Sequence, residues 1–337
     1  MAVYNGEPYV YDAVFSVLSQ DFINFEFIII DDCSTDNTSE IIQEFNDDRI
    51  KYFINKENIG QTKSLNIGIK KSIGKYIARV DADDLFYTEK LSKQFNYMES
   101  HPEIAACGTG SVKINDVGEK VGLRIPPVSH NEIISTMLYR SPMIHVSILM
   151  TRKCIINLNG YNEKYPICAD YDLWSRLIRN GYKLANIPDT LTSHRLLQHS
   201  TGNIDFLGNA INEVTEIIHN YWIKYVKISI TFDQCRDIAL IRRPESGLTI
   251  TRICNSFKLI IDARKKINVN WRYFDKINID IYKLLLWGVI KNNNYRQSIK
   301  GTSSVIQDNL SLLIKNLFYP RIFIIIIFSM LFTLVPN

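Results

Sequence analysis

Three aspartates fall within four positions of the segment "KYIARVDADDLF", directly after an alternating apolar run. Carboxylates at this spacing repel one another unless a cation lies between them. Alternate side chains of a strand share a face, so Asp81 and Asp83 can direct their carboxylates to one point. Mg²⁺ and Mn²⁺ prefer oxygen ligands, often one or two carboxylates together with substrate phosphates. The spacing therefore allows a Mg²⁺ or Mn²⁺ site formed by Asp81 and Asp83.

Two further motifs place polar side chains at the ends of predicted strands. The segment "IIIDDCSTDNT" ends a strand in Asp31 and Asp32. Carboxylates accept hydrogen bonds from ribose hydroxyls and from an amide-like N–H such as that of uracil. The segment "ENIGQTKSLNIG" brings Asn58, Gly60 and Lys63 to a strand-to-helix turn. Backbone amides at a helix start, together with a lysine, are suited to face phosphate.

Each motif also has an ordinary structural interpretation. An isolated Asp-x-Asp is most often a turn before a helix, and "DDCSTDNT" contains helix-capping residues. The turn at Asn58 is equally typical of a surface loop. The functional prediction depends on the three motifs occurring together, because all three follow predicted strands of one sheet.

Residues 1–115 predict a regular alternation of strands and helices. Strands are expected at 25–32, 50–55, 75–81 and 104–110, and helices at 7–20, 38–45, 61–74 and 88–100. This order favours an α/β fold with a mostly parallel sheet, helices on both faces and ligands beyond the carboxyl ends of the strands. The first strand is short, because "MAVY" gives four residues before a turn. Either it is truncated or its true start lies upstream.

The motifs occur in the order "VYNGEPYVYDAVFSVLSQDFINFEFIIIDDCSTDNT", "NIGQTKSLNIGI" and "GKYIARVDADD". This order resembles the GT-A-fold glycosyltransferases of family 2, a Rossmann-like fold for nucleotide-diphospho-sugars, over about residues 1–200. The resemblance implies that the DxD holds a metal on the diphosphate, its second aspartate being the more direct ligand. The resemblance also implies which residues bind the nucleotide-sugar donor: Val3, Tyr4, Asn5, Glu7, Asp31, Asp32, Asn58, Gly60, Lys63, Arg79, Asp81, Ala82 and Asp83.

The resemblance also implies a catalytic base. In "ICADYDLWSRL", Ala169 stands where the family usually has glutamate, and Asp170 keeps the aspartate. Asp170 would take the proton of an acceptor hydroxyl in an inverting transfer, which needs one base and no protein nucleophile. A helix cap is the ordinary alternative for this residue. His145, Arg195 and His199 are expected near the rim of the site.

Further departures from the family pattern are Ala2, where many relatives have proline, and Leu65, where an arginine is common. The absence of a QxxRW motif argues against a processive polysaccharide synthase. A nucleotidyltransferase would need a glycine-rich basic loop after the first strand, and a dehydrogenase would need GxGxxG. A catalytically silent scaffold of the same fold remains an alternative, motivated by the short first strand and by Ala169. Intact Asp81, Asp83 and Asp170 oppose it.

Charge divides the 337-residue chain into an acidic front and a basic back. Residues 1–221 carry 21 Lys/Arg against 28 Asp/Glu, whereas residues 222–337 carry 18 against 7. We expect a GT-A domain at 1–200, with nucleotide-sugar binding at 1–115 and an acceptor and catalytic part at 116–200. A basic, mainly helical region is expected at 201–337.

The apolar run "IFIIIIFSMLFTLV" near the C-terminus has 14 uncharged residues. As a helix it measures about 21 Å, short of the roughly 30 Å of a hydrocarbon core. With the basic, aromatic segments before it, it predicts membrane association through residues 320–337. This favours an enzyme on the inner face of the cell membrane that takes a UDP-sugar and a glycan or polyprenyl-linked acceptor, in surface-polysaccharide synthesis. No nucleic-acid partner is expected.

The six scattered cysteines form no CxxC pair, which argues against a zinc ribbon and a disulfide framework. A reducing, cytoplasmic setting is therefore expected. The first residues, "MAVYNGEPYV", have neither the basic start nor the long apolar core of a signal peptide.

Overall fold

The computed structural model describes residues 1–197, 206–241 and 248–269. The first elements are β1 (Ala2–Val3), α1 (Val10–Leu18), β2 (Phe27–Asp31), α2 (Thr38–Gln43), β3 (Ile50–Ile54), α3 (Gln61–Lys71), β4 (Tyr76–Ala78), β5 (Leu85–Phe86), α4 (Lys90–Ser100) and β6 (Ile104–Ile114). Then follow β7 (Lys120–Arg124), α5 (His130–Thr136), η1 (His145–Ser147), β8 (Leu149–Thr151), α6 (Arg152–Asn157), α7 (Ala169–Arg179), β9 (Lys183–Arg195), η2 (Phe206–Ala210), α9 (Ile211–Tyr221), η3 (Trp222–Val226), α10 (Phe232–Leu240) and α11 (Ile250–Lys266). Every strand and helix predicted within residues 1–115 is present, with its ends moved by a few residues.

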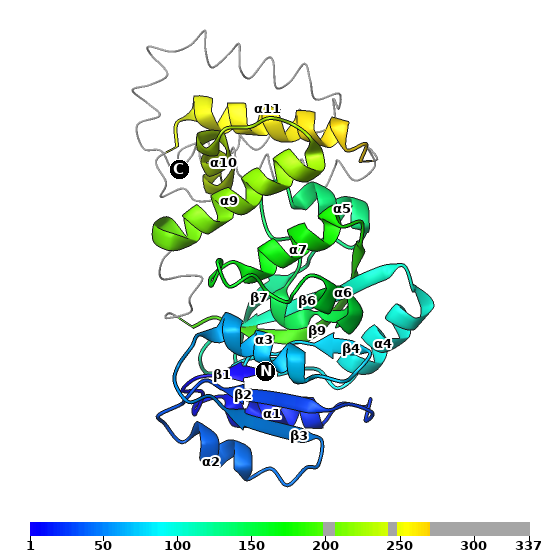
Figure 1. The fold of residues 1–337 in the computed structure, drawn as a ribbon, viewed down its shortest axis with the longest axis vertical. Coiled ribbons are helices and arrows are strands. Elements are labelled where there is room, and N and C mark those ends of the chain that lie inside the picture. The colour runs from blue at the N-terminus through cyan, green and yellow to red at the C-terminus, as the bar shows by residue number, and fades with distance from the viewer. Residues whose placement is uncertain (198–205, 242–247, 270–337) are drawn as a thin grey trace, which may run out of the picture.

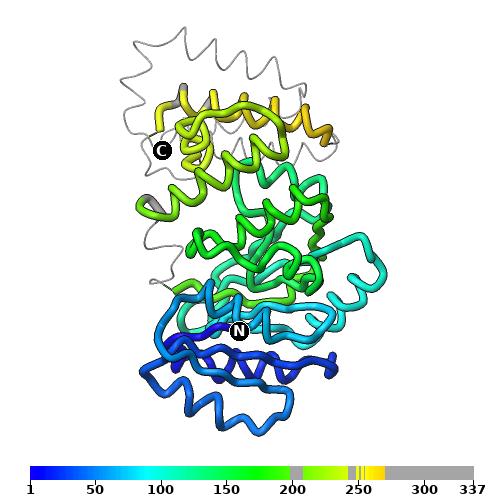
Figure 2. The backbone as a smooth tube through the Cα atoms, viewed as in Figure 1, coloured from blue at the N-terminus to red at the C-terminus, as the bar shows by residue number. Residues whose placement is uncertain are grey.

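Figure 1 shows the chain progressing along the long axis of the molecule, from β1–β3 and α2 at one end to α9–α11 at the other. The backbone tube in Figure 2 follows the same path. A sheet-based part and a helical part are therefore consecutive along both the sequence and the long axis.

The first sheet has the order β1-β2-β3 and is wholly parallel. Helices cover both faces of its central strand, β2, and the strand accordingly carries apolar side chains on both faces. Phe27 and Ile29 pack with α1 and α2, while the side chains of Ile28 and Ile30 lie against Gly68 of α3. This alternation places helices on both faces, as predicted.

The second sheet has the order β4-β8-β6-β9-β5, with β7 paired to β6. Within it only β6 and β9 run parallel, and the other described pairings are antiparallel. The α/β class is confirmed, but this half is less parallel than predicted. Periodicity identifies a strand without giving its direction. The short turn between β6 and β7 also permits only an antiparallel return.

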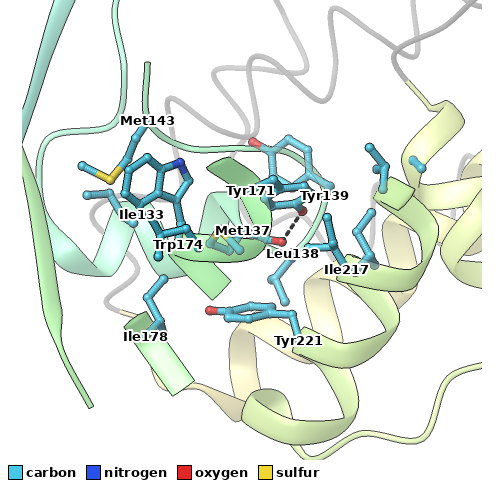
Figure 3. Packing of buried hydrophobic residues seen from close by; sticks show 14 of the residues in the cluster. Ile133, Met137, Leu138, Tyr139, Met143, Tyr171, Trp174, Ile178, Ile217 and Tyr221 are labelled. Carbon is cyan, nitrogen blue, oxygen red and sulfur yellow. Dashed lines mark hydrogen bonds between the residues drawn. The ribbon is translucent and has the colours of Figure 1, made fainter. Parts of the chain in front are cut away.

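The described helices of the C-terminal region share one hydrophobic core with residues 130–180. Figure 3 shows this packing around Trp174 and Tyr221. Buried polar atoms fix the contact: the Tyr221 hydroxyl donates to the Ile134 carbonyl at 3.0 Å, and the Trp222 indole N–H donates to the Leu138 carbonyl at 3.0 Å. In the described stretches beyond residue 200, which are 206–241 and 248–269, the regular elements are helical.

The predicted membrane-associating tail, residues 320–337, lies outside the described residues. Among the helices that are described, none combines the length and the apolar character needed to cross a bilayer. Five of the cysteines are free thiols, namely Cys33, Cys107, Cys154, Cys168 and Cys235. The division of the chain at residue 200 stays a prediction.

Candidate active site

The predicted DxD lies in the link between β4 and β5, at the edge of the second sheet. Asp81, Asp83 and Asp84 bring one carboxylate oxygen each to within 4.8 Å of one another. The segment is also a turn, since the Asp84 N–H donates to the Asp81 carbonyl at 3.4 Å. The turn interpretation and the metal-site interpretation are thus compatible, because the turn is what gathers the carboxylates.

Asp81 is the most strongly paired of the three aspartates. The buried guanidinium of Arg79 donates to both of its oxygens, and Gln61 donates to Oδ1 at 3.0 Å. Arg79 follows directly after β4, so the end of this strand places a cation beside the carboxylates. This ion pair offsets part of the cluster's negative charge and leaves Asp83 as the less engaged member of the DxD.

Asp84 was not expected to take part in the site, yet it is the most buried of the three. Its Oδ1 accepts the backbone N–H of Arg195 at 2.8 Å, while no described group donates to its buried Oδ2. A buried carboxylate oxygen without a donor is costly, and a hard divalent cation is a suitable partner for it. The residues present therefore fit Mg²⁺ or Mn²⁺. The presence of three aspartates within the four positions 81–84 was the available signal.

The protonation of the cluster reflects its crowding. Burial raises the pKa of Asp83, and the charge of Asp81 raises it further. Burial, followed by the charges of Asp81 and Asp83, raises the pKa of Asp84 well above its ordinary value. Both effects follow from placing like charges together away from water.

Arg195 was predicted near the rim of the site, and its guanidinium donates to backbone carbonyls. Nε donates to the Asp83 carbonyl at 3.0 Å, and Nη1 donates to the carbonyls of Asn115 and Asp116. The guanidinium also lies 4.3 Å from the centre of the Tyr9 ring. Arg195 thus holds the backbone of the aspartate turn against the β6–β7 turn.

Asp31 and Asp32 end β2 at the predicted place, and both are buried. Asp31 accepts from the Tyr52 hydroxyl at 2.5 Å and from the Ser34 N–H at 2.7 Å. Its oxygens therefore tie the end of β2 to β3 and to the following turn. Contact of Asp31 with a nucleoside stays a prediction.

Asp32 connects β2 to the start of α3. Its Oδ1 accepts from Asn55, Ile59 and Ser64, and its Oδ2 accepts the Gly60 N–H at 2.7 Å. Burial acts to raise the pKa of Asp32, but these hydrogen bonds outweigh it and lower the pKa. The amides of Ile59 and Gly60, which were expected to face phosphate, thus donate to this carboxylate.

The side chains expected around the donor differ in exposure. Asn58 and Lys63 are exposed, and Gly60 has a φ of +91°, a conformation that favours glycine. Tyr4 is exposed, whereas Val3 is buried. Lys63 and Tyr4 therefore offer free surface at the carboxyl edge of the first sheet.

The loop after β1 is locked to the loop after β2. Asn5 Oδ1 accepts the Thr35 N–H at 2.8 Å, and Glu7 accepts from both the N–H and the side-chain amide of Asn37. The Gly6 N–H donates to the Thr38 hydroxyl at 2.8 Å. Asn5 and Glu7 thereby fix the shape of this edge.

Asp170 lies in the first turn of α7, which is amphipathic and buries Trp174 on its inner face. The Ser141 hydroxyl donates to Oδ2 of Asp170 at 3.2 Å. Burial raises the pKa of Asp170, and a hydrogen bond from Tyr171 together with the charge of Arg124 offsets part of that rise. The result is a carboxylate more basic than an exposed aspartate, with Arg124 of β7 as an unforeseen cationic neighbour.

A glutamate from α9 shapes the loop that precedes α7. Glu213 Oε2 accepts the N–H groups of Ile167 and Cys168 at 3.1 and 2.8 Å. These two amides lie immediately before the helix that carries Asp170. Glu213 lies 43 residues after Asp170 in the sequence, so no local motif could have indicated this contact.

His145 lies deeper than the predicted rim. Its Nε2 lies 2.7 Å from the Tyr161 hydroxyl, and its ring meets Trp174 edge-on. Burial, followed by the charge of Arg79, lowers the pKa of His145 well below its ordinary value. The imidazole is therefore neutral at physiological pH. His199 lies outside the described residues.

Residues 1–158 match the sequence family described as "Glycosyl transferase family 2". An uncharacterized glycosyltransferase of Haemophilus influenzae is 31% identical over 261 residues, which cover 72% of this chain and 78% of that protein. This chain belongs to glycosyl transferase family 2. The amylovoran biosynthesis glycosyltransferase AmsE of Erwinia amylovora is 32% identical over 140 residues, or 42% of this chain and 52% of AmsE.

Two solved structures share the fold of this glycosyltransferase at low sequence identity. TarS 1-349 of S. aureus in complex with UDP-GlcNAc has a TM-score of 0.57 and 19% identity, covering 89% of this chain and 90% of TarS. The mannosyltransferase PcManGT of Pyrobaculum calidifontis in complex with GDP-Man and Mn²⁺ has a TM-score of 0.51 and 13% identity, covering 86% and 85%. The predicted family and the GT-A fold class are confirmed, and the protein is a glycosyltransferase rather than a nucleotidyltransferase or dehydrogenase.

Proposed function

We propose that this glycosyltransferase moves a sugar from a nucleotide-sugar donor, UDP-sugar being favoured, to a hydroxyl with inversion at the anomeric carbon and with a divalent cation. The observation that carries the proposal is the convergence of Asp81, Asp83 and Asp84 beside Arg79. Burial raises the pKa of Tyr161, and the charges of both Asp170 and Asp81 add to that rise, which supports placing Asp170 and the aspartate cluster around the same side chain. The nucleotide sugars bound by TarS and PcManGT agree with such a donor.

Asp81, Asp83 and Asp84 would hold Mg²⁺ or Mn²⁺. Asp83 is the most available ligand, because Arg79 engages both oxygens of Asp81. The Arg195 N–H likewise engages one oxygen of Asp84. When bound, the cation neutralises negative charge on the departing nucleoside diphosphate. The Mn²⁺ in the PcManGT complex is in keeping with this choice of metal.

Asp170 is proposed as the general base. Ser141 and the start of α7 orient its carboxylate, and burial raises its pKa so that it accepts a proton more readily. It takes the proton of the acceptor hydroxyl while that oxygen attacks the anomeric carbon, and the nucleoside diphosphate leaves on the opposite face. One carboxylate suffices for this step, so the alanine at position 169 does not prevent it.

The donor would lie along the carboxyl edge of the first sheet. Tyr4 and Val3 line the base, Lys63 approaches phosphate, and Oδ2 of Asp32, which accepts a single hydrogen bond, retains capacity for a nucleoside donor. We further propose a glycan or polyprenyl-linked acceptor in surface-polysaccharide synthesis, at the inner face of the cell membrane. The named role of AmsE in amylovoran biosynthesis supports this acceptor class.

The proposal is tested by titrating UDP into the full chain with Mn²⁺ or with EDTA. Wild-type protein should bind UDP only with Mn²⁺, Asp83→Asn should lose this dependence, and Asp170→Asn should bind normally. Transfer from a panel of UDP-sugars should be lost in both variants and kept in Asp262→Asn, a distant control on α11. Equal UDP binding with EDTA, or wild-type turnover by Asp170→Asn, would refute the assignment.

A further inference from the structure

Three strands of the second sheet place basic side chains on one face. Ser111 of β6 lies opposite Arg124 of β7. Lys113, two positions further along β6, lies opposite Gly122 of β7 and His194 of β9. Residues directly opposite each other on neighbouring strands, and alternate residues of one strand, share a face of the sheet. Arg124, Lys113 and His194 therefore lie on one face, which we call the basic face.

The basic face reaches from the proposed base to the aspartate cluster. Burial raises the pKa of Asp170, and the charge of Arg124 offsets part of that rise. Burial lowers the pKa of His194, on which the charges of both Arg124 and Asp81 act. Gly122 leaves the face open, because a Cβ at this position would meet only the Lys113 side chain, at 3.8 Å. The face thus lies beside the place to which the proposed reaction brings the acceptor hydroxyl.

A second arginine reaches the same end of the basic face from another element. Arg140 follows α5 and directly precedes Ser141, whose hydroxyl donates to Asp170 at 3.2 Å. Burial lowers the pKa of Arg124, and the charge of Arg140 acts in the same direction, whereas Asp170 opposes it. Two guanidinium groups are therefore close neighbours beside the proposed base.

Neither guanidinium has a counter-charge in residues 1–197, 206–241 and 248–269. No ion pair joins Arg124 or Arg140 to a carboxylate there, and the buried Nε of Arg140 has no hydrogen-bond acceptor. Like charges held together away from water are unfavourable, and a buried donor without an acceptor adds to that cost. Arg124 also weakens Asp170 as a base. An anion bound between the two arginines would relieve all three effects.

The donor groups suit a phosphate. A guanidinium is a planar fork of N–H groups that binds phosphate with two parallel hydrogen bonds. The two forks come from different elements, β7 and the loop after α5. A phosphate group offers three acceptor oxygens and can serve both, whereas a carboxylate has only two. The diphosphate of the donor is assigned to the cation at the aspartate cluster, so a phosphate on the basic face belongs to the acceptor.

We propose that Arg124 and Arg140 form a phosphate site for the acceptor, which is therefore a phosphorylated glycan or a glycan on a lipid phosphate rather than a neutral sugar. This inference rests on the proposed function, since Asp170 as the base defines the acceptor side. The phosphate lies next to the attacking hydroxyl and anchors the acceptor there. It also cancels the positive charge that would otherwise make Asp170 less basic.

Titration of glucose 1-phosphate and of geranyl phosphate into the full chain tests this site, both alone and with UDP and Mn²⁺ already bound. Both phosphates should bind under both conditions, and methyl glucoside and geraniol should not. Arg124→Gln and Arg140→Gln should each weaken phosphate binding about tenfold or more, at unchanged UDP affinity. Arg124→Lys, which keeps the charge but loses the fork, should recover part of the affinity. Arg252→Gln, which removes an exposed arginine of α11, is the control and should change nothing.

The two probes also separate the two sources of phosphate. Tighter binding of geranyl phosphate supports a lipid phosphate, and tighter binding of glucose 1-phosphate supports a sugar phosphate. Competition between UDP and the probes would overturn the proposal, because the arginines would then belong to the donor. Equal binding of glucuronate would overturn the phosphate assignment, and unchanged binding in both glutamine variants would overturn the site.

Urea unfolding separates a binding role from a structural one. Because each guanidinium lacks a counter-charge, neither glutamine variant should lower the urea midpoint, and a lower midpoint with unchanged phosphate binding would overturn the proposal. Failure of the donor assignment would look different. UDP binding that does not need Mn²⁺ would refute the metal site, yet it would leave the phosphate titration without nucleotide as it stands.

Discussion

Lys90 is a fully buried lysine that the proposed reaction does not use. Its Nζ donates to Oε1 of Gln94 at 2.7 Å and lies 3.9 Å from the centre of the Phe86 ring. Gln94 in turn donates to the carbonyls of Cys107 and Ser147, so the pair holds α4 to the second sheet. Burial lowers the pKa of Lys90 from 10.5 to about 7. The amine is thus half-charged near neutral pH inside the fold.

This pKa makes stability depend on pH in a direction that can be worked out. Between pH 7 and 10.5 the unfolded chain binds more protons at Lys90 than the folded chain, so the free energy of unfolding rises with pH. From these two pKa values, the lowered pKa of Lys90 costs the folded state about 4 kcal/mol at pH 7 and about 2 kcal/mol at pH 9, because at pH 9 the lysine must lose its proton to be buried. Lys90→Met removes this cost but leaves Oε1 of Gln94 unpaired, which offsets about 2 kcal/mol of the gain.

Urea unfolding of Lys90→Met and wild type between pH 7 and 9 measures the effect. The variant should be more stable by about 2 kcal/mol at pH 7, and the difference should fall close to zero at pH 9. Lys70→Met, which alters an exposed lysine on α3, is the control and should show no such trend. A difference between Lys90→Met and wild type that stays constant from pH 7 to 9 would refute the buried-amine reasoning.

Three further predictions concern the base and the helical layer. Because burial raises the pKa of Asp170, kcat/KM for transfer should begin to fall on acidification at a pH above the ordinary aspartate pKa. Ser141→Ala removes a hydrogen bond that stabilises the carboxylate, so it should move the acidic limb of the pH profile to higher pH. A move of the acidic limb to lower pH would contradict the assignment of Asp170. Glu213→Ala should lower kcat about tenfold at unchanged UDP affinity. Glu213→Gln, which keeps an acceptor for the loop amides, should restore most of it, and equal loss in both would exclude a positioning role. Tyr221→Phe should cost about 1 kcal/mol in urea unfolding, because the Ile134 carbonyl loses its donor; no change would show that the bond is dispensable.

The parts of the site that the sequence could predict depend on local pattern. Periodicity located β2 and β4, and polar residues at their carboxyl ends located the DxD and the Asp31–Asp32 pair. Ligands of α/β folds bind beyond the carboxyl ends of strands, so polar residues at these ends could be selected even though β2 and β4 belong to different sheets. The position of Asp170 in the first turn of a helix was predictable for a similar reason, since α7 is strongly amphipathic.

The remaining contacts depend on tertiary packing. Arg124 reaches the surroundings of Asp170 from β7, and Glu213 reaches the loop before α7 from α9. Neither residue has a local pattern that distinguishes it from other charged side chains. Arg195 was expected near the rim of the site, and from its position at the end of β9 it donates to backbone carbonyls. The type of a side chain determines which interactions it can make, whereas the tertiary structure determines which group it contacts.

The helices α9–α11 pack into a single core with α7, the helix that carries the proposed base Asp170. A fragment cut near residue 200 would expose the buried faces of Trp174 and Tyr171, together with the carbonyl groups that Tyr221 and Trp222 now satisfy. Such a fragment should precipitate rather than act as a minimal enzyme. A displacement of α9 would also move Glu213 and, through its two hydrogen bonds, the peptide units just before Asp170, the proposed base.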